Sequence, residues 1–294
     1  MRKKRKRRMI IIDMNQIMIS NLMTQLKHDF LNEKLVRHMV LTSLRMYEKQ
    51  YSPEYGEIVL AYDSKHYWRK DYFQFYKQNR KKDRERSGHD WGGIFDVLNK
   101  IRDEIKEYFP WKVIEVMGAE ADDVISTLCK NKDTGKVLIL SGDKDFIQLQ
   151  KYPGVYQFNP TTKKYISSDN PYAFVKEHVI KGDKSDGIPN FLSSDDTFVS
   201  GTRQKPISQK KLNVWVDQDP EKFCESQEQY KNYCRNRTLI DFDYVPEEIE
   251  TKIMEEYESL NSIKKQIPLE YFQKHQLNDL MQEFFFRSSS PFKK

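Results

Sequence analysis

The sequence is poor in cysteine and lacks long apolar runs, and both absences narrow the class of protein. Its 294 residues include three cysteines, Cys129, Cys224 and Cys234, whose spacing matches neither a metal-binding motif nor a disulfide framework. No stretch approaches the roughly 18 consecutive apolar residues of a membrane span, and no apolar segment of a signal peptide follows the charged N-terminus. We therefore expect a protein of a reducing, intracellular compartment that does not span a membrane.

Positive charge is abundant, and it is concentrated in two segments. The net charge is +6, but residues 2–8, "RKKRKRR", contribute seven positive charges, so the rest of the chain carries a net charge of −1. Residues 65–86 hold nine Lys or Arg against three Asp or Glu, with six aromatic residues among them. Such segregation is typical of proteins that bind a polyanion. We assign residues 1–8 to a basic tail, which could bind nucleic acid, engage an acidic partner or keep the protein soluble.

Apolar runs rich in β-branched residues alternate with helical patterns over the first 180 residues. This alternation predicts an α/β fold in which helices flank a mostly parallel sheet. The predicted strands are 9–13, 57–63, 111–116 and 136–143, with 152–158 as a candidate fifth. The predicted helices are 33–50, 66–80, 93–108, 120–130 and 171–181.

The pattern changes after Gly182. Residues 183–211 are rich in Ser, Asp, Gly, Pro and Lys, and helical segments without intervening strands follow around 220–237, 246–266 and 269–286. We therefore predict an α/β domain over 9–182 and a smaller, helical C-terminal domain over 183–294.

Acidic residues gather where the predicted strands end. Asp13, Asp63 and Asp143 close three strands, and the carboxyl ends of parallel strands line up along one edge of a sheet, where ligands bind. Further acids occur in "GAEADD", "SGDKDF" and "GDKSDGIP". Taken singly, each would be a helix cap or a turn residue. The full set of candidate metal ligands is Asp13, Asp63, Glu120, Asp122, Asp143, Asp145, Asp183 and Asp186.

Gathered at one edge, these carboxylates would repel one another and raise one another's pKa values unless cations compensate. Oxygen ligands without His or Cys favour Mg²⁺ or Mn²⁺, and the set is too large for one ion. The pattern therefore predicts two ions roughly 4 Å apart that act on a phosphodiester.

The basic segment follows directly after Asp63. A continuous helix over 66–80 would place Arg69, Lys77 and Arg80 broadly on one face, because they lie eight and eleven residues apart. These cations could then approach a phosphate at the acidic edge. The alternative is an amphipathic helix whose basic face lies in solvent.

Four motifs follow one another along the chain. They are "YWRKDYFQFYKQNRKK" after "AYD", then "EADD", "SGDKDF" and "GDKSDGIP". Together they resemble the 5′-nuclease or flap endonuclease family, and within it the ribonuclease H group of tailed bacteriophages. The resemblance runs from about residue 9 to at least 187, and "RTLIDFDYVP" extends it. It implies a PIN-like fold with a helical arch at about 65–90. The sequence departs from the family after Pro189, where "NFLSSDDTFVSGTRQKPISQKK" lacks most glycines of the duplex-binding hairpin.

The implied activity is that of a divalent-metal-dependent 5′ to 3′ exonuclease and 5′-flap endonuclease. It would act on RNA/DNA and DNA duplexes by two-metal phosphodiester hydrolysis and remove RNA primers during lagging-strand replication. The implied surroundings of the first ion are Asp13, Asp63, Asp122 and Asp143, with Glu120 nearby, and those of the second are Asp145, Asp183 and Asp186. The implied catalytic residues are Lys77, Arg80, Arg69, Asp122 and Asp143.

The implied nucleic-acid contacts are Arg69, Lys70, Tyr76, Lys77, Arg80, Lys81, Lys82, Arg203, Lys205 and Lys210. The resemblance further implies Mg²⁺, with Mn²⁺ as a substitute, forked, flap or 5′-ended duplexes as substrates, and a monomer in the cytoplasm of an infected bacterial cell. A single-strand-binding protein and a sliding clamp are implied as partners. In "LNDLMQEFFF", however, a helix packed on the body is favoured over a clamp-binding peptide.

Two other functions are compatible with parts of the pattern. A PIN-like single-strand ribonuclease would use the same sheet edge, but that function does not explain the basic segment 65–86 or the turn "GDKSDGIP". A non-catalytic replication scaffold could hold Mg²⁺ structurally. A phosphatase with an aspartyl nucleophile fits less well, since the first strand ends in the single Asp13.

Overall fold

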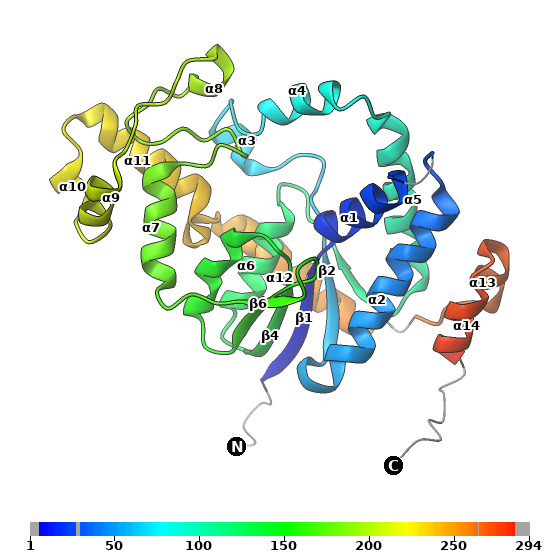
Figure 1. Ribbon diagram of the computed structural model, residues 1–294. Helices are drawn as coiled ribbons and strands as arrows, with labels where there is room; N and C mark the ends of the chain where they lie inside the picture. Colours follow the sequence, from blue (N-terminus) through cyan, green and yellow to red (C-terminus); the bar gives the residue numbers. More distant parts are fainter. Residues whose placement is uncertain (1–5, 28–29, 264, 286–294) are drawn as a thin grey trace, which may run out of the picture.

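The computed structural model describes residues 6–27, 30–263 and 265–285, of which 81–83 are described by their backbone alone. A six-stranded sheet in the order β3-β2-β1-β4-β5-β6 lies at its centre (Figure 1). The first five strands are parallel, and β6 is antiparallel to β5. The strands are β1 (Arg7–Asp13), β2 (Glu57–Ala61), β3 (Lys112–Ile114), β4 (Thr134–Leu140), β5 (Val155–Asn159) and β6 (Lys164–Ile166).

Both faces of the sheet are covered, as expected for parallel strands that are apolar along their whole length. In β1, Ile10 and Ile12 join one hydrophobic core, whereas Met9 and Ile11 join the other. The first core packs against α1 (Met14–Leu26), α2 (Glu33–Tyr55) and α5 (Trp91–Tyr108). The second packs against α6 (Ala121–Lys130), the 3₁₀ helix η1 (Lys144–Lys151) and α12 (Glu247–Ser259).

The strand order reverses between β1 and β4. Chain connections leave in opposite directions from this point, so the space beyond the two carboxyl ends is the place where ligands of such sheets bind. Asp13 ends β1, and Ser141 follows β4 directly. The topology therefore places the predicted acidic edge at the switch point of the sheet.

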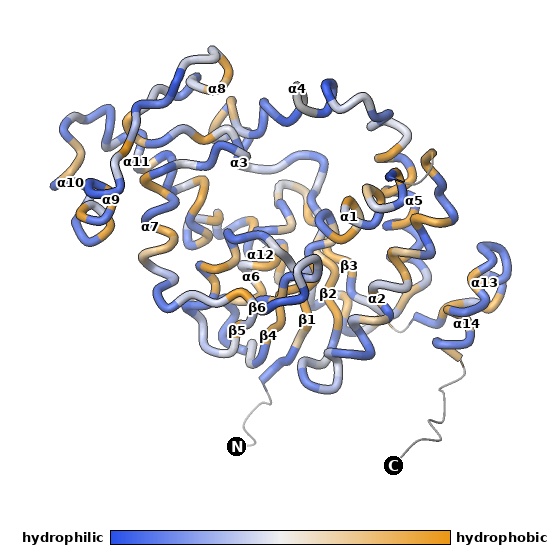
Figure 2. Tube along the Cα trace, in the orientation of Figure 1, coloured by the Kyte–Doolittle hydropathy of each residue, from blue (hydrophilic) through white to orange (hydrophobic). Residues whose placement is uncertain are grey.

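A third core supports the arch that sequence analysis placed at about 65–90. It contains Phe73 and Tyr76 together with residues of four helices, α7 (Pro171–Lys181), α9 (Gln209–Val216), α10 (Pro220–Phe223) and α11 (Gln227–Ile240). The short α8 (Thr197–Ser200) lies in the same part of the molecule (Figure 1). The arch itself is hydrophilic along α4, in contrast to the apolar strands (Figure 2).

The predicted helix over 66–80 is wrong. The segment instead forms α3 (Trp68–Tyr72), an irregular turn and α4 (Asn79–Arg86). Lys77 has a positive φ of 56°, and its backbone N–H donates to the carbonyl of Asp186 at 2.8 Å. A continuous helix would lose this bond and the burial of Phe73 and Tyr76, so tertiary contacts override the helical pattern.

Other boundaries also differ from the sequence analysis. The basic tail was assigned to residues 1–8, but Arg7 and Arg8 belong to β1, where Arg7 pairs with Thr134 and Arg8 with Lys136 of β4. Residues 1–5 lie outside the described part. Sequence analysis did not predict α1, which begins where Asp13 caps it by accepting from the N–H of Gln16. It also did not predict β6 or η1.

The α/β fold with a mostly parallel sheet and a helical C-terminal region is confirmed. The last three helices of the predicted C-terminal domain pack against the sheet. Helix α12 packs into the second core, and α13 (Leu269–His275) and α14 (Asn278–Phe285) pack into the first, as the favoured alternative for "LNDLMQEFFF" requires. Among the described residues, no helix has the length and hydropathy needed to cross a membrane.

Candidate active site at the carboxyl edge of the sheet

Hydrogen bonds join the ends of β1 and β4 at the switch point. The hydroxyl of Ser141 donates to Asp13 Oδ2 at 3.0 Å and accepts from the N–H of Asp143 at 3.1 Å. Gln16 reinforces this link, since its Oε1 accepts from the N–H of Gly142 at 2.6 Å. Burial raises the pKa of Asp13, although its hydrogen bonds with Gln16 and Ser141 oppose the rise. Sequence analysis did not single out Ser141 or Gln16.

Asp63 follows β2 by two residues and reaches the start of α6. Its Oδ1 accepts from the N–H of Ala121 at 2.7 Å, so it satisfies one of the donors left free at a helix N-terminus. Burial raises the pKa of Asp63 to about 6, and the nearby charges of Glu120 and Asp13 add to this, against the opposing effect of Lys77.

Asp122 and Asp143 complete this carboxylate group. Burial raises the pKa of Asp122 well above its usual range, and the charges of Asp143, Glu120 and Asp13 contribute, whereas Lys77 opposes them. Desolvation and the charge of Asp145 raise the pKa of Asp143 to about 6. Burial and mutual repulsion thus disfavour the ionised forms of these carboxylates, and a divalent cation would favour the ionised forms.

Glu120 has a different environment. It is 1% exposed and accepts hydrogen bonds from Arg69 Nη1 at 2.9 Å, Tyr76 OH at 3.1 Å and Lys77 Nζ at 2.6 Å. Burial acts to raise the pKa of Glu120, but Lys77 and Arg69 hold it below its usual value. The oxygens of Glu120 already accept from three donors, all of them residues of the arch. Glu120 therefore holds the arch in place in this structure, and its predicted role as a metal ligand would require those donors to move.

Asp186 fastens the arch to the "GDKSDGIP" turn. Tyr76 OH donates to its Oδ2 at 2.8 Å, Arg80 forms an ion pair with its Oδ1, and Lys77 Nζ lies 3.5 Å from Oδ2. Asn79 Nδ2 also donates to the carbonyl of Lys184 at 3.1 Å. Lys77 and Arg80 therefore meet at Asp186, and the irregular turn before α4 brings them there in place of helical spacing.

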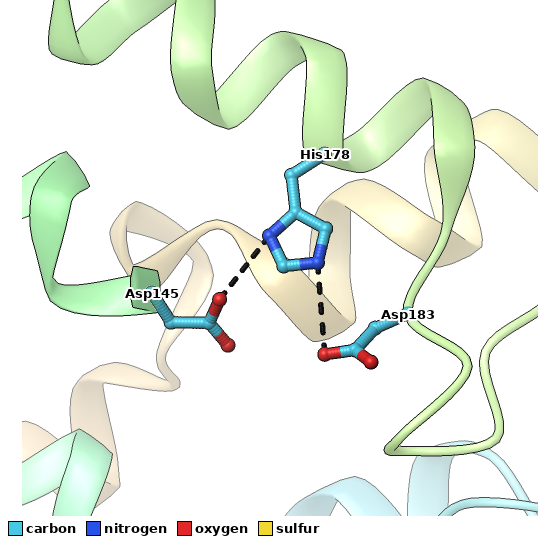
Figure 3. A group of neighbouring side chains, drawn as sticks. All are labelled: Asp145, His178 and Asp183. Atoms are coloured by element: carbon cyan, nitrogen blue, oxygen red, sulfur yellow. Dashed lines mark ion pairs between the residues drawn. The ribbon is translucent and has the colours of Figure 1, made fainter. Parts of the chain in front are cut away.

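Asp145 and Asp183 lie on either side of His178, a residue of α7 that the sequence analysis missed (Figure 3). Nδ1 of the imidazole lies 3.2 Å from Asp145 Oδ1, and Nε2 lies 3.6 Å from Asp183 Oδ2. Burial acts to lower the pKa of His178, but the two carboxylates raise it to about 10. Within the described part of the chain, this is the one group whose three ligand atoms all lie within 4.8 Å of one another.

The predicted nucleic-acid contacts fall into four groups. Arg69 and Tyr76 are 2% and 3% exposed and are bonded inside the protein, so their positions do not support contact with a phosphate or a base. The side chains of Lys81 and Lys82 lie outside the described part of the structure. Lys77 is paired with Glu120 and Asp186. The other predicted contacts are exposed, and they are Lys70, Arg80, Arg203, Lys205 and Lys210.

A cavity of about 790 Å³ lies between the arch and the sheet edge. Asp63 lines it, as do cations of the arch and several aromatic residues. The cations are Lys65, Lys70, Lys77, Arg80 and Arg84, and the aromatic residues include Tyr62, Tyr67, Trp91 and Phe95. A negatively charged chain with planar bases would find complementary groups on these walls.

Two family models together span nearly the whole chain. The model described as "5'-3' exonuclease, N-terminal resolvase-like domain" matches residues 8–180. The chain belongs to this 5′–3′ exonuclease family. The model described as "T4 RNase H, C terminal" matches residues 171–285. The prediction of a 5′-nuclease related to bacteriophage ribonuclease H, and hence of a hydrolase that acts on nucleic acid, is thereby confirmed.

Individual relatives agree with this membership. The chain is 34% identical over 282 residues to ribonuclease H of Enterobacteria phage T4, and the match covers 92% of each protein. It is 30% identical over 144 residues to a 5'-3' exonuclease of Buchnera aphidicola subsp. Acyrthosiphon pisum, which covers 45% of this chain and 47% of that protein.

Solved structures of the bacteriophage T5 D15 protein share the fold. One, co-crystallised with metal ions, has a TM-score of 0.60 at 17% identity and covers 86% of this chain and 99% of that one. Another, the T5 D15 flap endonuclease in complex with DNA and metal ions, has a TM-score of 0.62 at 17% identity and covers 87% and 100%. These similarities confirm the PIN-like 5′-nuclease fold.

Proposed function

We propose that this member of the 5′–3′ exonuclease family is a divalent-metal-dependent nuclease that also cuts 5′ flaps, in RNA/DNA as well as DNA duplexes. The observation that carries the proposal is the group of poorly neutralised carboxylates Asp13, Asp63, Asp122 and Asp143 directly below a basic arch. The bacteriophage T5 relative that was crystallised with DNA and metal ions supports both parts of it.

The residues divide into those that would hold ions and those that would hold the nucleic acid. Ions bound by the four carboxylates would polarise the scissile phosphate and lower the pKa of the attacking water. Arg80, whose side chain is 45% exposed, can exchange its ion pair with Asp186 for a phosphate oxygen. Lys77 lies deeper and would neutralise charge beside Glu120. The exposed Arg203, Lys205 and Lys210 would contact duplex backbone.

Several finer features belong to the same proposal. Mg²⁺ is the proposed ion, with Mn²⁺ as a substitute, because most of the ligands are carboxylate oxygens. We propose further that the protein acts as a monomer in the cytoplasm of an infected bacterial cell, where it removes RNA primers. A single-strand-binding protein and a sliding clamp are proposed partners.

The proposal is tested with a labelled 5′-flap duplex and the Asp143→Asn variant. Loss of this carboxylate should lower the cleavage rate at least roughly 10²-fold, since charge stabilisation at the reacting centre is lost, while duplex binding is retained. Asp169→Asn, an exposed aspartate before α7, is the matched control and should cleave normally.

Near-normal cleavage by Asp143→Asn would overturn the assignment of the site. Binding by the unaltered protein without cleavage, with Mg²⁺ or Mn²⁺ present, would instead favour a scaffold. Cleavage of single-stranded RNA with no effect of the duplex would favour the PIN-like ribonuclease.

A further inference from the structure

His178 brings a nitrogen atom to an acidic site that the sequence pattern described as oxygen-only. Helix α7 presents it above the gap between η1 and the "GDKSDGIP" turn, and its ring points between Asp145 and Asp183 (Figure 3). The helix is well fixed, because Asn170 caps it by accepting from the N–H of Ala173 and Pro171 occupies its first turn. The position of the His178 side chain is therefore set by the fixed position of α7.

The two carboxylates are oriented so that one oxygen of each faces the imidazole. Asp183 Oδ1 accepts from the N–H and the hydroxyl of Ser185, both at 2.7 Å, and this leaves its Oδ2 on the side of His178. Asp145 Oδ1 lies on the other side of the ring. Nδ1 of His178 faces this oxygen at 3.2 Å. One ligand atom from each of the three residues lies within 4.8 Å of the other two, which is close enough for them to share an ion.

We propose that His178 supplies a nitrogen ligand to the second divalent ion, beside Asp145 and Asp183, so that this site favours Mn²⁺ or Zn²⁺ over Mg²⁺. The inference rests on the proposed metal-dependent function. Imidazole nitrogen suits zinc and other transition metals better than it suits Mg²⁺, which prefers oxygen atoms throughout. The first site, formed by carboxylates, would keep the preference for hard cations, so the two sites would differ in the ion they select.

The charges of the group agree with this assignment. Asp145 and Asp183 carry two negative charges, and a divalent ion between them would supply two positive charges. A neutral imidazole nitrogen would complete the ligand set without adding charge.

The inference is tested by pulsed electron paramagnetic resonance of Mn²⁺ bound to the full chain, without nucleic acid. The unaltered protein should bind two Mn²⁺, and one of them should show hyperfine coupling to a histidine ¹⁴N. His178→Ala should lose that coupling and bind the second Mn²⁺ about 10–100-fold more weakly. Retained binding of the first ion reports that the variant is folded. His38→Ala, on α2, is the matched control and should keep the coupling.

A Zn²⁺ competition measurement adds a second readout. The preference of the second site for Zn²⁺ over Mg²⁺ should fall at least about 10-fold in His178→Ala. Absence of ¹⁴N coupling in the unaltered protein would overturn the inference, as would tighter ion binding by His178→Ala, which would identify the imidazolium as a competitor of the ion.

Cleavage of the 5′ flap separates this inference from the proposed function. Cleavage by a protein without ¹⁴N coupling would overturn the ligand assignment alone. Coupling in a protein that never cleaves would support the ligand assignment and overturn the proposed function alone.

Discussion

Asp63 combines a structural hydrogen bond with an unfavourable charge. Its carboxylate caps α6 through the N–H of Ala121, yet it lies among other acids, and burial raises its pKa to about 6. Asn at this position would keep the acceptor oxygen and remove the charge. The two effects of Asp63 can therefore be separated by one substitution.

We predict that Asp63→Asn changes how the stability of the metal-free protein depends on pH. The folded pKa lies above the ordinary value of 3.8, so the folded state binds this proton more tightly than the unfolded state. The resulting stabilisation is complete below about pH 4 and is lost as the pH rises through about 6. In EDTA, the unfolding free energy of Asp63→Asn relative to the unaltered protein should therefore rise by about 2–3 kcal/mol between about pH 4 and pH 7.

Urea unfolding at several pH values checks this prediction, with the exposed Asp169→Asn as control. Divalent ions added at neutral pH should stabilise the unaltered protein more than Asp63→Asn. A difference between the two proteins that does not change with pH would contradict the assigned pKa shift.

At the scale of elements, Arg69 joins α3 to two other helices. Its Nη1 lies 2.9 Å from Glu120 Oε2 and 2.8 Å from Asp123 Oδ1 in α6, and its Nε donates to the carbonyl of Leu239 in α11 at 2.9 Å. Sequence analysis assigned it to phosphate contact. The structure gives it a positioning role, because it fixes the base of the arch over the acidic edge.

We predict that Arg69→Met destabilises the protein by about 3–5 kcal/mol, since the buried Asp123 loses its ion-pair partner and the buried Glu120 keeps only Lys77. Lys70→Met is the matched control, because Lys70 is the exposed neighbour in the same helix, and it should change stability by less than about 0.5 kcal/mol. Urea unfolding measures both. Equal stability of the two variants would show that the buried ion pairs do not hold the arch.

At the scale of the whole molecule, the end of the chain returns to the first core. Phe272 of α13 is fully buried, and its ring packs against Phe109 and Phe284, with centroids 6.5 and 5.7 Å away. The last helices of the predicted C-terminal domain therefore share a core with the sheet. Folding of the two parts should consequently be coupled.

We predict that Phe272→Ala lowers the free energy of unfolding by about 3–5 kcal/mol in a single transition, because it leaves a cavity in a shared core. Leu269→Ala, in the same helix but 45% exposed, should have little effect. Circular dichroism and tryptophan fluorescence should report the same midpoint for each variant. Separate transitions for the two parts would contradict the shared core.

Much of the fold and part of the site could be predicted from particular residues. The runs that end in Asp13, Asp63 and Asp143 each satisfy a local rule for buried parallel strands, so their convergence on one edge followed from sheet topology. Lys77 could not be placed in this way, since its positive φ depends on a bond to Asp186, more than a hundred residues away. His178 was missed because nothing in its local sequence distinguishes it from an ordinary helical residue, and its two carboxylate neighbours come from other segments.

Local patterns were thus sufficient for the five parallel strands, their acidic edge and the family, because hydrophobic periodicity and strand-end residues act over a few neighbouring positions. The tertiary structure alone decided which charges meet. It paired Glu120 and Asp186 with the arch, buried Arg69 and Tyr76, and placed His178 between Asp145 and Asp183. Burial and electrostatic pairing depend on distances between segments remote in sequence, and only the packed chain sets those distances.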